Sequence, residues 1–245
     1  MHLKKGATSH HFDEWASSYD SELKNALGPF AAQELSQYSA RKARLIRYSV
    51  EKLLGKPSSD LSCCEGGCGV GNLTSQLSKY FKITKGWEPS PASHEIANSK
   101  TPRIEVMLGD NPVQLFKKER FDCVVASCVL HHIAPTERAR FLLSAIKILK
   151  ENGVLVVVEH NPYNPFTRWA VARCGFDRDA ELLTLASLRR SLASFRPKNF
   201  SGLYFGFMPN AMLSEKILDP WLGWLPIGAQ WMASVLFSKS KYQKK

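Results

Sequence analysis

A glycine-rich segment, Glu65–Gly71 (EGGCGVG), carries the most specific chemical signal in the sequence. Its residues Gly67, Gly69 and Gly71 follow the spacing G-x-G-x-G. Glycine lets the backbone turn tightly and approach a ligand that a Cβ atom would block, and a helix that follows presents unpaired N–H groups. A dinucleotide fingerprint needs a small residue where this chain has Asn72, and a P-loop needs a lysine that is missing. The loop therefore fits a nucleoside-like ligand better than one with phosphates.

Two further carboxylates follow the loop at intervals that suit the same ligand. Glu88 lies at the expected end of a second strand, where it can accept hydrogen bonds from two ribose hydroxyls. Asp110, in the segment Gly109-Asp110-Asn111, follows a third strand and can accept a hydrogen bond from an adenine amino group. Either acid alone could be a solvated loop residue. Because ligands of open α/β sheets bind outside the carboxyl ends of the strands, we expect both acids and Glu65 to converge on one crevice.

The elements that must position these residues alternate between short apolar runs and helical segments. Such alternation predicts an α/β fold with a mostly parallel sheet and helices on both faces. We expect one domain, with an N-terminal helical cap (1–57), a cofactor-binding core (58–160), and substrate-side helices with the last two strands (161–245). Seven strands are predicted over residues 61–65, 83–88, 104–108, 121–127, 154–159, 200–207 and 230–237, and helices over 33–54, 72–80, 91–98, 136–150, 166–174 and 182–195.

These motifs resemble the class I S-adenosylmethionine-dependent methyltransferases, in particular the small-molecule group similar to ubiquinone and menaquinone biosynthesis enzymes. The resemblance covers residues 61–160 and implies a Rossmann-like sheet, with S-adenosyl-L-methionine as cofactor. It also implies that Tyr19, in an N-terminal Tyr-Asp segment, lies over the cofactor. Two departures from the family pattern, Leu-Ser-Cys-Cys in the first strand and Glu-Asn-Gly before the fifth, remove no cofactor contact. The expected cofactor-binding residues are Tyr19, Glu65, Gly67, Cys68, Gly69, Gly71, Asn72, Glu88, Pro89, Asp110, Asn111, Ser127 and Cys128.

Three histidines at the same expected sheet edge are candidate catalytic bases: His131 and His132 after the fourth strand, and His160 after the fifth. Histidine suits proton transfer because its unperturbed pKa is about 6.5. Glu159 and Tyr163 are further candidates. The alternative is that the histidines only pack or bond at a helix start, and a base is needed only for some acceptors.

A formal net charge of +11 leaves the acceptor open. A small-molecule acceptor is our first expectation. The charge could instead serve an RNA methyltransferase, since cationic surfaces attract nucleic acid, although the basic residues form no stripe. A third alternative is a non-catalytic module that binds an adenosyl ligand or a membrane surface. The tryptophan-rich segment 220–238, with the lysine-rich tail 239–245, could contact a membrane peripherally, or form a buried strand and an apolar substrate wall.

The six cysteines and the polar N-terminus favour a reducing, cytoplasmic setting. No metal site is expected, because no CxxC pair occurs and adjacent Cys63 and Cys64 would point to opposite faces of a strand. The sequence indicates no oligomeric state.

Overall fold

The computed structural model describes residues 9–28, 35–100, 104–208, 215 and 218–238. Three parts of our expectations lie outside the described residues. These are the tail 239–245, positions 33–34 at the start of the first long helix, and residues 209–214, 216 and 217 of the expected substrate-side region (161–245).

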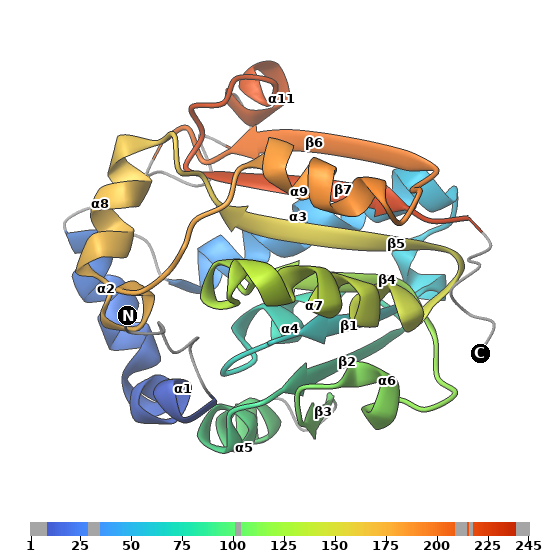
Figure 1. The fold of residues 1–245 in the computed structure, drawn as a ribbon, viewed down its shortest axis with the longest axis horizontal. Helices are drawn as coiled ribbons and strands as arrows, with labels where there is room; N and C mark the ends of the chain where they lie inside the picture. Colours follow the sequence, from blue (N-terminus) through green and yellow to red (C-terminus); the bar gives the residue numbers. More distant parts are fainter. Residues whose placement is uncertain (1–8, 29–34, 101–103, 209–214, 216–217, 239–245) are drawn as a thin grey trace.

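Seven strands form a single sheet in the order β3-β2-β1-β4-β5-β7-β6 (Figure 1). The first five are parallel, and β7 is antiparallel to both β5 and β6. This confirms the expected mostly parallel, seven-stranded sheet. The strands are β1 (Ser62–Gly66), β2 (Ile83–Glu88), β3 (Glu105–Leu108), β4 (Phe121–Ser127), β5 (Leu149–His160), β6 (Asn199–Phe205) and β7 (Gln230–Leu236).

Helices cover both faces of the sheet, and β5 shows why. Val154, Val156 and Val158 pack into one buried cluster with two helices, whereas Leu155 and Val157 pack into another cluster on the opposite face (Figure 1). A strand that is apolar on both faces is typical of the interior of a parallel sheet. The first cluster includes α3 (Leu35–Leu54) and α4 (Asn72–Leu77), and the second includes α7 (Pro135–Lys147) and α9 (Leu185–Ala193).

Several of the remaining helices lie at the carboxyl ends of the parallel strands (Figure 1). Of the expected N-terminal cap (1–57), α1 (Ser9–Trp15), η1 (Ala16–Ser18) and α2 (Tyr19–Leu27) lie at these strand ends and are called the cap below, with α8 (Pro165–Arg173) beside them. The long helix α3 of that expected region packs instead on a face of the sheet. The others are η3 (Ser58–Asp60), α5 (Pro91–Lys100), α6 (Pro112–Leu115), η4 (Leu130–His132), η5 (Gly175–Asp177) and α11 (Asp219–Leu222).

One predicted boundary is wrong. The helix expected over 136–150 ends at Lys147, and β5 begins at Leu149 rather than Val154. The pairing of β5 with β4 shifts register over these extra residues. Asn152 has a φ of 62°, in the left-handed region that asparagine tolerates better than most residues. The chain therefore enters the strand earlier than the Asn-Gly turn signal suggests.

The apolar segment 220–238 divides into two unlike parts. Trp231 in β7 is fully buried, and its indole N–H donates to the Leu183 carbonyl oxygen at 3.0 Å. This part is the expected buried final strand. Trp221 and Trp224, by contrast, are 78% and 75% exposed. Within the described residues, no helix is long and apolar enough to cross a membrane.

A buried ion pair joins α3 to the segment between the last two strands. The guanidinium of Arg41 contacts the carboxylate of Asp219, and both residues are buried. The Asp219 carboxylate also accepts a hydrogen bond from the Gly206 amide at 3.2 Å. Loss of one partner would leave the other charge buried without its ion pair.

We therefore expect Asp219→Ala to lower the free energy of unfolding by about 3–5 kcal/mol. The matched surface control is Glu215→Ala, which removes the more exposed pair with Arg44 and should cost less than about 1 kcal/mol. Urea unfolding followed by circular dichroism measures both changes. Equal losses in the two variants would contradict the expectation.

Candidate functional site

The three strand-end acids line one cavity of about 1350 Å³. Glu65 lies in β1, Glu88 ends β2, and Asp110 follows β3. The structure therefore brings together the carboxylates that the sequence analysis expected to converge. Of the expected cofactor-binding residues, all line this cavity except Gly71, and so do the three candidate histidines.

The glycine loop borders the cavity with bare backbone. Gly67 and Gly69 have φ values of 61° and 53°, which L side chains rarely adopt. A Cβ atom added at Gly69 would meet no atom within 4 Å, so the backbone there faces open space. Gly71 has a different role, because it caps α4 and packs closely on Ala97.

Gly66, which the sequence analysis did not single out, is the tightest position of the loop. A Cβ atom there would lie 2.2 Å from the Trp87 ring. The glycine is thus required by packing, and no local signal distinguishes it from its neighbours in the sequence.

Burial shapes the electrostatics of the two glutamates. Glu65 accepts a hydrogen bond from the Thr74 hydroxyl at 2.5 Å, yet desolvation raises the pKa of its carboxyl to about 8. Glu88 accepts hydrogen bonds from the backbone amides of Gly69 at 2.7 Å and Ser90 at 2.9 Å. Burial still raises the pKa of Glu88 above its usual value, because desolvation outweighs those bonds.

Asp110 and Asn111 differ in how free their side chains are to bind a ligand. Asp110 is exposed at the edge of the cavity. The Asn111 side chain instead accepts a hydrogen bond from the Val113 amide at 3.1 Å and so caps α6. The capping role of Asn111 follows from the Asn-Pro sequence at a helix start.

The N-terminal cap is fastened to the rim of the cavity by two aspartates. Asp13 accepts hydrogen bonds from the Ser90 hydroxyl at 2.5 Å and the Ala92 amide at 3.2 Å. Asp20 accepts a hydrogen bond from the Asn72 amide group at 2.9 Å. Asn72, expected to bind cofactor, therefore also anchors the cap.

Tyr19 places its ring inside the cavity lining. The ring stacks on Phe176 with centroids 4.9 Å apart and an interplanar angle of 10°. Together with Phe12 and Trp15, it gives the cap an aromatic inner surface. The cap thus covers the cavity from the side opposite the strand ends.

A buried glutamate organises the histidines. Glu159 accepts hydrogen bonds from the amides of Val129 at 3.0 Å and Leu130 at 2.7 Å, and its second oxygen lies 2.5 Å from His131 Nδ1. Desolvation opposes ionisation of Glu159, but these partners prevail and hold its pKa down at about 2. His131 is buried too, and the neighbouring carboxylates raise its pKa well above the usual value despite desolvation.

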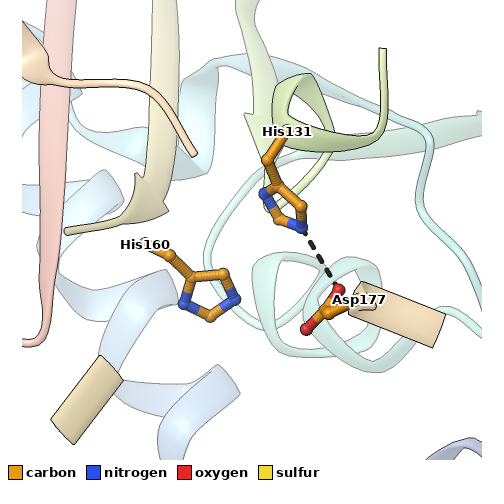
Figure 2. Close-up of side chains that lie close together, drawn as sticks. All are labelled: His131, His160 and Asp177. Atoms are coloured by element: carbon orange, nitrogen blue, oxygen red, sulfur yellow. Dashed lines mark ion pairs between the residues drawn. The ribbon is translucent and has the colours of Figure 1, made fainter. Parts of the chain in front are cut away.

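Asp177 completes this cluster from η5, which follows α8 (Figure 2). Its Oδ1 atom lies 3.4 Å from His131 Nε2 and 3.2 Å from His132 Nε2. Burial, with His131 beside it, lowers the pKa of His132 to about 4. Sequence reasoning missed Asp177. The only signal in the sequence was an acidic residue close to the apolar residues Cys174 and Phe176.

A second cluster lies at the end of β4. The Lys42 ammonium is 3.3 Å from the Ser127 hydroxyl and 3.2 Å from the Cys128 thiol. Burial raises the pKa of that thiol, but Lys42 and His160 outweigh burial and lower it to about 6. Gln230 contacts the same sulfur at 3.5 Å. Sequence reasoning missed Lys42 and Gln230, whereas Tyr163 lies exposed outside the cavity lining.

The topology and the site together define a Rossmann-like methyltransferase fold. A family model described as "Methyltransferase domain" matches residues 38–200, and the chain belongs to this family. A solved SAM-dependent methyltransferase of Thermotoga maritima, a possible histamine N-methyltransferase, superposes with a TM-score of 0.63 at 20% identity, over 93% of this chain and 98% of that one.

Two curated relatives match part of the chain. An uncharacterized methyltransferase of Oceanobacillus iheyensis is 29% identical over 147 residues, which cover 59% of this chain and 63% of the relative. A ubiquinone biosynthesis O-methyltransferase of Azorhizobium caulinodans is 28% identical over 106 residues, 42% of this chain and 41% of that protein. The match thus spans less than two thirds of the length of either relative.

The pKa of Glu65 yields a prediction about stability. Since its carboxyl titrates at about 8 in the folded chain but ordinarily at 4.5, the folded state binds the extra proton between these values. The contribution of Glu65 to the free energy of unfolding is complete below about pH 4.5 and is lost as the pH rises to about 8. We expect Glu65→Gln, which cannot lose a proton, to gain stability relative to wild type by a few kcal/mol between pH 5 and pH 9.

Urea unfolding at the two pH values measures this difference. The control is Glu51→Gln, because bonds from Ser58 lower the pKa of Glu51 and keep it ionised throughout that range. An identical pH dependence in wild type and Glu65→Gln would contradict the assignment.

Proposed function

We propose that this chain transfers a methyl group from S-adenosyl-L-methionine to a small-molecule acceptor. The observation that carries the proposal is the convergence of Glu65, Glu88 and Asp110 with the bare backbone of Gly69 on one cavity. Family membership supports the same activity.

The residues present fit this cofactor. Glu65 and the backbone of Gly67 and Gly69 would hold its methionine part, Glu88 the ribose hydroxyls and Asp110 the adenine amino group. A Cβ atom at Gly69 would project into open space, which is the place where a ligand can approach the backbone. The cavity, at about 1350 Å³, exceeds the usual range of about 300–1,000 Å³ for one ligand and leaves room for an acceptor beside the cofactor.

When bound, the cofactor supplies an electrophilic methyl carbon on a sulfonium. The duties of the chain are then to align the acceptor and to exclude water. The aromatic inner surface of the cap excludes water, and the Lys42–Cys128 cluster and the histidines form the polar wall on the acceptor side. Both ring nitrogens of His131 already face carboxylates, and the same Asp177 engages His132. Of the three expected bases, His160 therefore has the ring most open to an acceptor.

We expect Glu88→Ala and Gly69→Val each to weaken binding of S-adenosyl-L-methionine at least about 100-fold, because the first removes the ribose acceptor and the second fills the cradle with a side chain. Isothermal titration calorimetry with the purified chain measures this. Glu105→Ala is the matched control, since Glu105 is exposed on β3, pairs with Lys85 and lies outside the cavity lining. Unchanged binding in both cavity variants would remove the proposal.

The fraction of a cell extract that receives a labelled methyl group identifies the class of acceptor. We expect label in the small-molecule fraction when the chain is incubated with methyl-labelled S-adenosyl-L-methionine and a cell extract, because the cap covers the cavity. Label in RNA, with binding that weakens steeply as salt rises, would favour the RNA alternative. Binding of cofactor with no labelled product in any fraction would favour a non-catalytic module.

A quinone-like hydroxylated acceptor and contact with a membrane surface remain finer proposals. The first is supported by the partial match to a ubiquinone biosynthesis O-methyltransferase. The second is supported by the exposed Trp221, Trp224 and Ile227, which lie just before β7. The first would send label into the lipid fraction of the same experiment. A cytoplasmic location also remains a prediction, in keeping with the six free thiols.

A further inference from the structure

Three side chains of metal-binding type meet at the wall of the cavity from three separate elements. His131 comes from η4, His160 ends β5, and Asp177 ends η5 (Figure 2). One nitrogen or oxygen atom of each lies within 4.8 Å of the others. All three residues line the cavity.

The ring of His131 is held in the orientation that metal ligation requires. Its Nδ1 atom lies 2.5 Å from Glu159, so Nε2 points to Asp177. Glu159 is fixed in turn by the amides of Val129 and Leu130. A carboxylate that accepts a hydrogen bond from the far nitrogen of a histidine is the usual outer partner of a metal-bound imidazole.

The gap between His131 and Asp177 suits a shared ion better than a hydrogen bond. His131 Nε2 and Asp177 Oδ1 are buried 3.4 Å apart, which is long for a charge-assisted hydrogen bond, and His132 Nε2 lies 3.2 Å from the same oxygen. Two ligands on a tetrahedral zinc ion, with bonds of about 2.0–2.1 Å, lie about 3.3 Å apart. The observed distance between His131 Nε2 and Asp177 Oδ1 matches this ligand-to-ligand distance, whereas a charge-assisted hydrogen bond would be about 2.7–2.9 Å long.

His160 supplies the third ligand from the cavity side. Its ring centroid is 5.1 Å from that of His131, and the ring planes are inclined at 48°. The side chain is half-buried, and its ligand atom lies within 4.8 Å of those of His131 and Asp177. Two imidazoles and one carboxylate favour zinc and similar transition metals over magnesium or calcium.

We propose that His131, His160 and Asp177 bind one divalent transition-metal ion of the zinc type, with Glu159 as the outer partner of His131. Three protein ligands leave a fourth position, which faces the cavity and takes water or an oxygen or nitrogen atom of a bound molecule. The proposal departs from our expectation that the chain has no metal site. It goes beyond the proposed methyl transfer and does not depend on it, because ion binding is measured without cofactor or acceptor.

The test uses the full chain, stripped with a chelator and titrated with Zn²⁺ by calorimetry and with Co²⁺ by visible absorption. We expect one ion per chain and the strong absorption bands of four-coordinate Co²⁺, with no comparable uptake of Mg²⁺. Changing a ligand, as in His160→Ala or Asp177→Asn, should weaken binding about 100-fold or more.

Two control variants separate this site from other donors. His94→Ala removes a histidine of α5 that contacts the Val106 carbonyl outside the cavity lining, and Cys128→Ser removes the thiol of the neighbouring cluster. Both should bind Co²⁺ like wild type. If His160→Ala proves unfolded by circular dichroism, the isosteric Asp177→Asn decides.

Three outcomes would overturn the proposal. They are no stoichiometric ion in the wild-type chain, unchanged affinity in both ligand variants, and loss of binding in Cys128→Ser instead. Absence of a stoichiometric ion would leave His131 as a protonated ring between two carboxylates. If calorimetry still shows S-adenosyl-L-methionine binding in that case, the proposed function stands while the metal site falls.

Discussion

Buried glutamates at the carboxyl ends of parallel strands are the constraint on which the site depends. Glu65, Glu88 and Glu159 lie at the ends of β1, β2 and β5, and all three are buried. A buried carboxylate is tolerable only when its oxygens accept hydrogen bonds. Glu88 takes them from the glycine loop, and Glu159 takes them from the η4 turn. Glu88 and Glu159 therefore hold two of the loops that border the cavity.

The parts of this arrangement that local pattern dictates could be predicted from the sequence. Val154–Val158 is apolar at every position, which is typical of an interior parallel strand, and the Gly67–Gly71 spacing marks the turn after β1. The convergence of Glu88 and Asp110 followed from the rule that parallel strands end at one edge. Each inference needed only a segment and its place in the strand order.

The other half of the site depends on contacts between distant segments. Lys42 reads as one cation among several in an amphipathic helix, and only the packing of α3 on the sheet brings it to Cys128. Asp177 lies in a short turn after α8 with no pattern around it, yet its partner His131 is 46 positions earlier in the chain. The helix expected over 136–150 was misjudged for a related reason, because pairing with β4 extended β5 to Leu149.

The cap explains why we propose a small acceptor. Asp13 and Asp20 bind the start of α5 and Asn72, while Tyr19 stacks on Phe176 from the other side. The cap is thus bonded to both flanks of the cavity, and a macromolecular acceptor that displaced it would have to break these contacts together. Several hydrogen bonds and an aromatic stack, each worth about 0.5–1.5 kcal/mol, would be lost in that opening. A small molecule beneath the closed cap avoids the cost and meets the polar wall formed by Lys42, Cys128 and His160 directly.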